Sequence, residues 1–356
     1  MNPLFNFTHT DTDKGTLEWR SPSNIALIKY WGKHGEQKPI NPSVSMTLKY
    51  AFTQTEIHWS PKSSPSAADF EFFLSQQKVG EKFEKRVGQL IKIIAAEYPK
   101  INEKLLTINS INTFPHSTGI ASSASGLSAL ALALMSLGKR LHGQDLSYDA
   151  FLQKASYYAR LGSGSACRSV YAPYAIWGAG ATANSTNEFA IPFTPHNDFL
   201  KIHDSILIFS KTPKTVSSSA GHELMNNHAY KQGRIAQANE NTQNMLEALK
   251  SGDFEKWQHI TENEALALHG LMLSSVSPVL QLLPDSIQFL TDFMAFRKGK
   301  GLKAAFTIDA GPNIHILYAP EHYEEVRAFI SNWITERRRP IDVIDDETGK
   351  GAKELF

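Results

Sequence analysis

The stretch LSALALALMSL, residues 127–137, constrains the fold of this chain more than any other segment. It is too short to cross a bilayer, because a membrane-spanning helix needs roughly 20 apolar residues in a row. A helix that is apolar on every side has to be covered on every side by other parts of the protein. The stretch therefore predicts a buried helix over residues 126–140 and a sizeable core around it.

The composition fits a globular protein with such a core. Of the 356 residues, 42% are hydrophobic and 20% are charged, and this length allows two domains. Lys and Arg together number 36 and Asp and Glu 35, so the formal net charge is only +1. No overall basic field exists to attract nucleic acid, and an anionic ligand would need a local cluster of cations.

The single cysteine and the first residues narrow the class of protein further. One cysteine cannot form a disulfide framework, and no Cys/His spacing suggests a zinc site. The opening MNPLFNFTHTDTDKG lacks the basic start and the apolar run of a signal peptide. We therefore expect a cytoplasmic protein that binds neither membranes nor nucleic acid.

Helices and strands are expected to alternate irregularly along the chain. Residues 104–114 have the pattern of a strand and lead through a Gly- and Ser-rich loop into the buried helix. Other segments with helical patterns are 81–97, 146–162, about 220–250, 253–270, 285–298 and a last helix that begins near Tyr323. Other segments with strand patterns are 205–210 and a pair of strands within 303–320. Because strict βαβ alternation is absent, we expect an α+β fold. Residues 190–202 have the composition of a loop, so we place the domain boundary there and expect domains at 1–198 and 199–356.

The loop PHSTGIASSASG, residues 115–126, is the first candidate for a functional site. Its small residues let backbone N–H groups converge, and the helix that follows adds its positive N-terminal end, which is an arrangement that binds phosphate. It matches neither the Walker A pattern nor GxGxxG. The alternative is a plain turn in which Ser123 or Ser125 caps the helix.

The second candidate is SNIALIKYWGKHG, residues 23–35, in which Lys29 and Lys33 flank Tyr30 and Trp31. The alternative is the end of a strand that carries two solvated lysines. Lysine is rarely buried without a partner. If the apolar run before Lys29 carries this residue into the interior, it needs an anionic partner.

The third candidate is RLGSGSACRSVY, residues 160–171, which contains the only cysteine. Ser163 and Ser165 offer hydroxyl groups, and Arg168 offers a guanidinium that binds carboxylate or phosphate through two hydrogen bonds. Cys167 has no evident base partner, and small cysteines are commonly buried as apolar residues. We therefore expect Cys167 to pack and its neighbours to bind an anion.

The fourth candidate is Asp309 in TIDAGPN, at the end of an apolar strand. Aspartate in such a position is either a turn former or a catalytic carboxylate. Taken together, the four candidates comprise cationic donors, a phosphate loop and one carboxylate. This set fits ATP-dependent phosphoryl transfer to a substrate that bears both phosphate and carboxylate.

The four motifs resemble those of the diphosphomevalonate decarboxylase family of the GHMP kinase superfamily. NIALIKYWGK, FPHSTGIASSASG, GSGSACRS and FTIDAGPN occur in the family's order over nearly the whole chain. The resemblance implies a GHMP kinase fold, with an N-terminal half like the second domain of ribosomal protein S5 and a ferredoxin-like C-terminal half. It implies a homodimer that uses ATP and Mg²⁺ to convert (R)-5-diphosphomevalonate to isopentenyl diphosphate, ADP, phosphate and carbon dioxide.

The same resemblance assigns roles to individual residues. Asp309 is implied to act as base or orienting group at the C3 hydroxyl, with Lys29 beside it and the transferred phosphate. Arg168 is implied to hold the C1 carboxylate, with help from Asn24. The other residues implied to bind substrate are Tyr30, Lys33, Ser163, Ser165 and Ser218. The residues implied to hold the ATP phosphates are Gly119, Ser122 and Ser123, with Ser123 near Mg²⁺.

The sequence departs from the family pattern in three places. The loop has residues 116–118 as His-Ser-Thr, and Lys82 stands where many members place an arginine near the start of a helix. In VSSSAGHEL, His222 replaces a methionine, and Ser219 replaces an arginine that binds diphosphate in some bacterial relatives. The alternative function is therefore a phosphomevalonate decarboxylase, or a kinase that stops after phosphorylating C3. A non-catalytic binding protein would be expected to lack part of the four motifs, and all are present.

Overall fold

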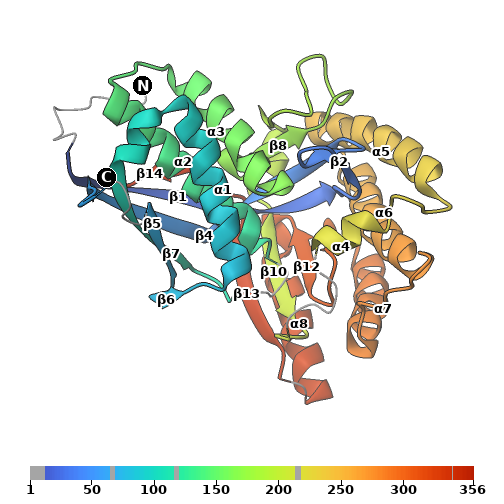
Figure 1. The fold of residues 1–356 in the computed structure, drawn as a ribbon. Helices are drawn as coiled ribbons and strands as arrows, with labels where there is room; N and C mark the ends of the chain where they lie inside the picture. Colours follow the sequence, from blue (N-terminus) through green and yellow to red (C-terminus); the bar gives the residue numbers. More distant parts are fainter. Residues whose placement is uncertain (1–12, 65–68, 116–119, 213–217, 339) are drawn as a thin grey trace.

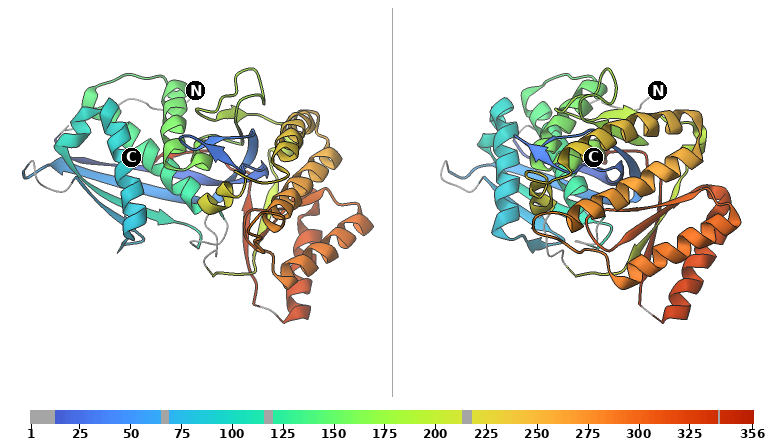
Figure 2. Two further views of the ribbon diagram at one scale, coloured as in Figure 1. Left: turned by 45° about the vertical axis from the view of Figure 1, so that its right-hand side comes forward. Right: turned by 90° about the vertical axis from the view of Figure 1, so that its right-hand side faces the viewer.

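The structure is a computed structural model that describes residues 13–64, 69–115, 120–212, 218–338 and 340–356, without the side chains of residues 218 and 219. Helices and strands are mixed without regular alternation, so the α+β prediction is confirmed. Figures 1 and 2 show a larger sheet covered by helices and, beside it, a smaller sheet with helices of its own.

The larger sheet has eight strands and carries the first core. Its order is β14-β1-β4-β7-β5-β6, and β8 and β9 extend it from β4. The two longest strands, β1 and β4, pair antiparallel along most of their length. The strands are β1 (Gly15–Ile28), β4 (Ser43–Pro61), β5 (Phe70–Leu74), β6 (Gln77–Lys78), β7 (Lys104–Asn112), β8 (Tyr174–Trp177), β9 (Ile191–Phe193) and β14 (Lys353–Glu354).

Three helices pack on one face of this sheet, as Figure 1 shows: α1 (Glu81–Glu97), α2 (Ser122–His142) and α3 (Tyr148–Gly162). Helix α2 packs on β1 and β4 and contacts both other helices, while α1 also reaches β5. The leucines of α2 at 132, 134 and 137 are fully buried. The prediction of a buried apolar helix is therefore confirmed, although the helix begins four residues earlier than expected. The packing is close, because a Cβ added at Gly138 would lie 2.5 Å from the Tyr98 ring.

Buried hydroxyl groups attach the start of α2 to the sheet. Ser125 Oγ lies 2.7 Å from Thr53 Oγ1 on β4, and Ser21 Oγ on β1 donates to Ser128 Oγ at 2.8 Å. The N-cap residue is Ala121, which forms no side-chain cap hydrogen bond. The expected serine cap is therefore wrong, and the serines instead fix the position of the helix start against the strands.

The smaller sheet has the order β11-β12-β10-β13 and lies between two groups of helices. One face packs against α5 and α6 and the larger sheet, and the other face packs against α7 and α8. The strands are β10 (His203–Ile208), β11 (Ala304–Ile308), β12 (Ile314–Tyr318) and β13 (Asp342–Glu347). The helices are α5 (Lys231–Ser251), α6 (Phe254–Leu273), α7 (Pro284–Lys300) and α8 (Tyr323–Arg337).

The remaining elements are short. They are the hairpin β2 (Lys33–His34) and β3 (Lys38–Pro39), helix α4 (Ser218–Glu223), and four 3₁₀ helices, η1 (Pro99–Glu103), η2 (Gly164–Val170), η3 (Asn197–Phe199) and η4 (Pro320–His322). The single helix predicted over 220–250 is wrong, because α4 ends at Glu223 and α5 begins at Lys231. Tertiary contacts explain the break: Met225 is buried beside Trp31, and His228 Nε2 hydrogen-bonds the Leu271 carbonyl.

The last strand crosses the expected domain division. Most strands before residue 198 lie in the larger sheet, and β10 to β13 form the smaller one. However, β14 pairs with β1, with Glu354 opposite Trp19 and Lys353 opposite Arg20. The division at 198/199 stays a prediction, and the C-terminal strand is the part of the second half that returns to the first.

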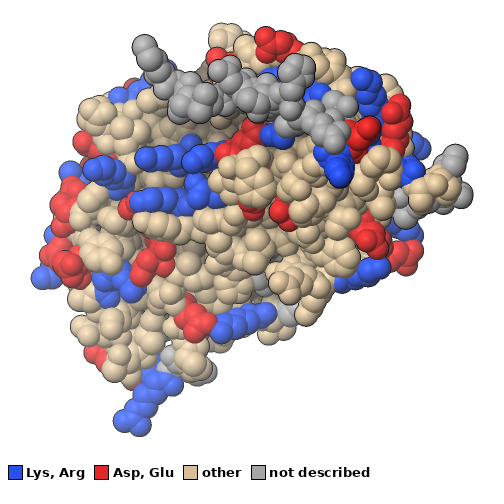
Figure 3. All heavy atoms as spheres, turned by 90° about the vertical axis from the view of Figure 1, so that its left-hand side faces the viewer, with Lys and Arg blue, Asp and Glu red and all other residues tan. Residues whose placement is uncertain are grey.

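The surface charge agrees with the balanced composition. On the face that Figure 3 shows, basic and acidic side chains occur among uncharged ones, and both signs are spread over the face. Within the described ranges, no helix is long and apolar enough to cross a membrane. The local cluster of cations that an anionic ligand requires lies inside the molecule.

Candidate active site

A cavity of about 160 Å³ opens where the two halves of the chain meet. Its wall combines the end of β1, the 3₁₀ helix η2, the first half of α1, the start of α2, the end of α4 and the turn after β11. The lining residues are Ala26, Lys29, Tyr30, Trp31, Lys33, Gln37, Arg86, Ala121, Ser123, Gly162, Ser163, Gly164, Ser165, Arg168, His222, Leu268, Asp309 and Ala310. All four sequence motifs therefore contribute to one cavity.

Lys29 and Asp309 form an ion pair across the cavity. Lys29 follows β1, and its side chain is only 2% exposed. Its Nζ lies 2.7 Å from Oδ1 of Asp309, which directly follows β11 and is 29% exposed. The alternative of a solvated lysine is thus wrong for Lys29, and the anionic partner that a buried lysine requires is Asp309.

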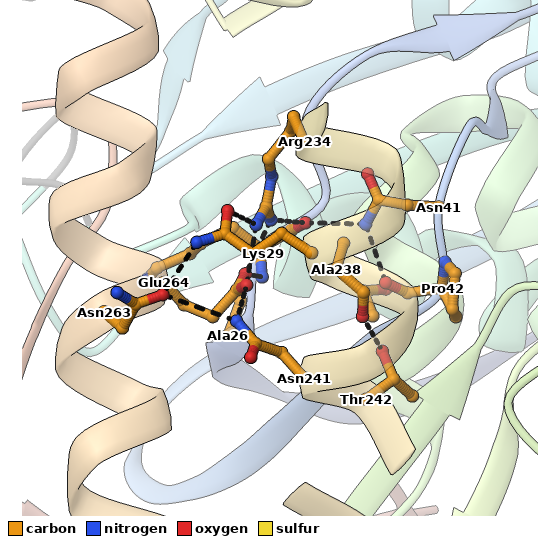
Figure 4. Close-up of polar contacts among 12 residues, drawn as sticks. Ala26, Lys29, Asn41, Pro42, Arg234, Ala238, Asn241, Thr242, Asn263 and Glu264 are labelled. Atoms are coloured by element: carbon orange, nitrogen blue, oxygen red, sulfur yellow. Dashed lines mark hydrogen bonds and ion pairs between the residues drawn. The ribbon is translucent and has the colours of Figure 1, made fainter. Parts of the chain in front are cut away.

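The backbone of Lys29 is held by a second, fully buried ion pair, shown in Figure 4. The Lys29 N–H donates to Glu264 Oε2 at 2.9 Å, and the Lys29 carbonyl accepts from Arg234 at 3.3 Å and from Asn41 at 3.0 Å. Arg234 and Glu264 are bound to each other by two hydrogen bonds of 2.6 Å and are 2% and 0% exposed. Helices α5 and α6 of the second half therefore fix the end of a strand of the first half.

Arg168 is a buried cation with neutral partners. Its guanidinium is 2% exposed and donates to Ser43 Oγ at 2.6 Å, to Ser45 Oγ at 3.1 Å and to Asn24 Oδ1 at 3.4 Å. Burial lowers the pKa of Arg168, and the charge of Asp309 acts in the opposite direction. Among the described residues, no carboxylate lies within ion-pair distance of Arg168. A buried cation of this kind gains most from an anionic ligand.

Asn24 lies behind Arg168 and does not line the cavity. It is 3% exposed, and its Nδ2 donates to Ser169 Oγ at 2.8 Å and to the Ser165 carbonyl at 3.4 Å. Asn24 Oδ1 accepts from Arg168, so this side chain positions the guanidinium that lines the cavity, and its help in holding the substrate carboxylate stays a prediction.

Tyr30, Ser163 and Ser165 line the cavity together, as expected. The Tyr30 hydroxyl donates to the Gln37 carbonyl at 3.0 Å, and burial raises the pKa of this phenol, so that it stays protonated. A Cβ added at Gly164 would lie 2.7 Å from the Tyr30 hydroxyl oxygen. The glycine between the two serines is thus needed for the tyrosine to approach them.

Cys167 points into the core, away from the cavity. It is fully buried, its Sγ donates to the Gly164 carbonyl at 3.0 Å, and burial raises the pKa of the thiol to about 12. A thiol with such a pKa is not a nucleophile at neutral pH. The expectation that Cys167 is a packing residue is confirmed.

Arg86 is a cavity residue that the sequence did not reveal. It lies one helical turn after Lys82 on α1 and lines the cavity, whereas Lys82 is exposed to solvent. Burial and the nearby Arg86 lower the pKa of Lys33, and Glu223 opposes them. Lys33 and Arg86 therefore form a pair of like charges at one end of the cavity. The four-residue spacing on one helix face was the available signal.

The start of α2 reaches the cavity through Ala121 and Ser123. Ala121 has the left-handed φ of +45°, which is uncommon for a residue with a side chain, and it turns the chain into the helix. The N-terminal end of this 21-residue helix, which is the positive end of the helix dipole, therefore faces the cavity. Ser122 does not line the cavity. Gly119 lies outside the described residues, as does the side chain of Ser218.

His222 on α4 also lines the cavity, although it was not among the expected site residues. Its Nδ1 accepts a hydrogen bond of 2.9 Å from the Gly32 backbone N–H. Burial, followed by the charges of Lys33 and Arg168, lowers the pKa of His222 to about 3. The imidazole is therefore neutral at physiological pH.

The donor set suits a metal that arrives with a nucleotide better than a resident metal. Within the described ranges, no group of three or more His, Cys, Asp or Glu side chains could hold a metal ion. Mg²⁺ in phosphoryl-transfer sites is commonly bound by one or two protein oxygens, substrate phosphates and water. The hydroxyl of Ser123 and the carboxylate of Asp309 fit this requirement.

The fold and the cavity together define the class of protein. A two-part α+β chain whose cavity combines the start of a buried helix with cationic side chains has the GHMP kinase fold, and solved proteins of this fold superpose on 96% of the chain. Residues 21–189 match the family model "Diphosphomevalonate decarboxylase-like N-terminal domain". Residues 205–353 match "Mevalonate 5-diphosphate decarboxylase C-terminal domain". The chain belongs to the diphosphomevalonate decarboxylase family.

Individual relatives agree with this assignment. The diphosphomevalonate decarboxylase of Schizosaccharomyces pombe is 30% identical over 321 residues, which are 86% of this chain and 79% of the relative. The solved mevalonate diphosphate decarboxylase of Enterococcus faecalis is 28% identical, with a TM-score of 0.80 over 96% of this chain and 98% of its own. A structure described as MDDEF in complex with MVAPP, AMPPCP and magnesium is 29% identical, with a TM-score of 0.81 over the same shares.

Replacing Cys167 by alanine is expected to leave turnover within about threefold of the unchanged protein, because the thiol only packs. Steady-state turnover and an unfolding curve measured on the same preparation separate a chemical effect from a loss of stability. A loss of activity beyond a hundredfold in a folded Cys167→Ala variant would give the thiol a chemical role that this geometry denies.

Replacing Glu264 by glutamine is expected to lower the free energy of unfolding by about 3–5 kcal/mol, because the buried guanidinium of Arg234 loses its counter-charge. Urea unfolding measures this change. The matched control is Glu247→Gln on α5, where a 71% exposed carboxylate pairs with Lys256. That control should cost at most about 1 kcal/mol. Equal losses in the two variants would show that the buried pair does not hold the strand end.

Proposed function

We propose that this chain catalyses the ATP-dependent decarboxylation of (R)-5-diphosphomevalonate to isopentenyl diphosphate, with release of ADP, phosphate and carbon dioxide. The observation that carries the proposal is the buried Lys29–Asp309 pair beside a buried Arg168 that has only neutral partners. One carboxylate and one unpaired cation are what a substrate with a reacting hydroxyl and a neighbouring carboxylate requires. Family membership and the relatives' bound ligands support the same reaction.

A tertiary hydroxyl is a poor leaving group, so the first step phosphorylates it. The C3 oxygen forms a bond to the terminal phosphorus of ATP, the bond from that phosphorus to ADP breaks, and the hydroxyl proton passes to Asp309. Asp309 accepts a hydrogen bond from this hydroxyl and orients it. Lys29 Nζ, 2.7 Å from Asp309, stabilises the negative charge that develops on the transferred phosphate. Because Lys29 is almost fully buried, its charge is weakly screened by water and acts strongly over this distance.

In the second step, the C3 phosphate leaves, positive character develops at C3, and the C1 carboxylate departs as carbon dioxide. Arg168 holds that carboxylate in a bidentate fork. Its present partners are hydroxyls and an amide, so the substrate supplies its counter-charge. The electrons of the C1–C2 bond form the new double bond between C2 and C3, which leaves the diphosphate end unchanged.

The phosphates of ATP and the phosphate end of the substrate are assigned to opposite ends of the cavity. The phosphates of ATP, with Mg²⁺, are assigned to the positive end of α2, where Ser123, Ser122 and Gly119 would hold them. Bound Mg²⁺ would neutralise charge on the phosphates. The phosphate end of the substrate is assigned to Lys33 and Arg86; the other residues proposed to bind it are Tyr30, Ser163, Ser165 and Ser218.

The sequence leaves both the diphosphate and the monophosphate open as substrate, because Ser219 stands where some relatives have a diphosphate-binding arginine. The paired cations Lys33 and Arg86 favour the diphosphate over the monophosphate, since two like charges are best neutralised by a ligand of higher charge. A cytoplasmic location and a homodimer, as the family resemblance implies, stay predictions.

The proposal is tested by supplying ATP with 5-diphosphomevalonate or 5-phosphomevalonate and measuring ADP and carbon dioxide together. We expect one carbon dioxide for each ADP with the diphosphate, and at least tenfold lower kcat/KM with the monophosphate. ADP without carbon dioxide would show a kinase and refute the decarboxylase proposal. A preference for the monophosphate would refute the proposed substrate and keep the reaction type.

Replacing Asp309 by asparagine is expected to reduce carbon dioxide release by about 10²- to 10⁴-fold, because the hydroxyl loses its negatively charged hydrogen-bond acceptor. Binding of an ATP analogue, measured by calorimetry, should change little. The matched control is Asp198→Asn on the surface, which should keep full turnover. An Asp309→Asn variant with normal turnover would remove Asp309 from the chemistry.

A further inference from the structure

His222 is held rigidly at the wall of the cavity. It is 8% exposed, and its ring lies against two aromatic rings, with centroid distances of 4.2 Å to Tyr30 and 5.2 Å to Trp31. The backbone of α4 packs closely on Trp31, because a Cβ added at Gly221 would lie 2.3 Å from the Trp31 ring. The imidazole therefore has little freedom to rotate away from its present orientation.

The hydrogen bond to Gly32 sets which nitrogen carries the proton. Nδ1 accepts from the Gly32 N–H at 2.9 Å, and a nitrogen that accepts carries no hydrogen. The charged form would need a hydrogen on both nitrogens, and burial with the neighbouring Lys33 and Arg168 opposes that form. The ring is thus the neutral tautomer with its hydrogen on Nε2.

The Nε2–H donor has no partner among the described residues, although the side chain is more than nine-tenths buried. The Nε2 atom itself is accessible at the cavity wall, so its N–H can donate to a molecule bound in the cavity. The cavity that His222 lines also contains Lys33 and Arg168, which together attract an anion. A hydrogen-bond donor beside two cations is suited to an oxygen that carries negative charge.

We infer that His222 is a specificity-determining residue that donates a hydrogen bond from Nε2 to an anionic oxygen of the substrate. The inference rests on the proposed function and deepens it, because it names a contact that fixes the substrate between the Lys33 end and the Arg168 end of the cavity. Unlike the two cations, a neutral donor adds direction without adding charge. The oxygen belongs either to the phosphate end or to the carboxylate of the substrate.

A purely structural role for His222 is the competing explanation, since Nδ1 supports the Gly32 backbone. Two substitutions separate the roles. In His222→Asn, the amide oxygen can replace Nδ1 and accept from Gly32, but the donor at the position of Nε2 is lost. In His222→Gln, the longer amide places a donor near the position of Nε2 and loses the contact with Gly32.

The experiment measures KM and kcat for 5-diphosphomevalonate in both variants, with His259→Gln on the exposed face of α6 as the control. We expect KM to rise roughly 10- to 100-fold in His222→Asn and less than about fivefold in His222→Gln, with kcat changed less than KM. A larger defect in His222→Gln than in His222→Asn would overturn the inference in favour of the structural role. Equal defects, or none in either variant, would overturn it as well.

Calorimetry with simpler probes identifies the oxygen and separates this inference from the proposed function. If the contact is to phosphate, His222→Asn weakens binding of inorganic diphosphate and leaves mevalonate binding unchanged. If the contact is to the carboxylate, His222→Asn weakens binding of mevalonate and leaves binding of inorganic diphosphate unchanged. Unchanged binding of both probes would overturn the inference. These measurements do not require turnover, so an unmodified protein that releases no carbon dioxide would refute the proposed function while the role of His222 is still decided.

Discussion

The ion pair between Lys29 and Asp309 is the interaction on which the rest of this structure depends. Lys29 directly follows a strand of the larger sheet, and Asp309 directly follows a strand of the smaller one, so the pair joins the two halves at the cavity. Burial of a lysine is unfavourable unless a negative charge compensates it. The chain satisfies this requirement only when the two sheets are packed together. The same contact therefore serves the fold and the chemistry.

The surroundings of this pair keep the cavity ready for an anionic substrate. The backbone of Lys29 is held by the Glu264–Arg234 pair, and the Arg168 guanidinium is held by hydroxyls and an amide. Such fixed groups need little rearrangement when charge develops, which is how preorganised electrostatics accelerates a reaction. The cost is a site with more positive than negative charge in the free protein, which the substrate and ATP are suited to neutralise.

Much of this arrangement could be predicted from the sequence, because local patterns carry it. The apolar stretch within α2 predicted the buried helix, and the apolar run before Lys29 raised the need for an anionic partner. The identity of that partner could not be derived from spacing, since Asp309 is 280 residues away. The family resemblance, and not a local pattern, identified Asp309 as this partner.

Other features depend on tertiary packing and could not be derived from local patterns alone. Arg86 reaches the cavity because α1 packs against α3, whose last residue, Gly162, also lines the cavity. Asn24 lies behind Arg168 because its amide is held by hydrogen bonds. The break between α4 and α5 follows from the burial of Met225. In each case the position was decided by contacts between distant segments, which propensity and periodicity do not record.

The most direct test of this account is a double-mutant cycle on carbon dioxide release with Lys29→Met, Asp309→Asn and the combined variant. If the two residues act as one unit, the combined variant should be about as slow as the slower single variant, because the first substitution already disables the pair. If the combined loss equals the product of the two single losses, Lys29 and Asp309 act independently, and the central claim is contradicted.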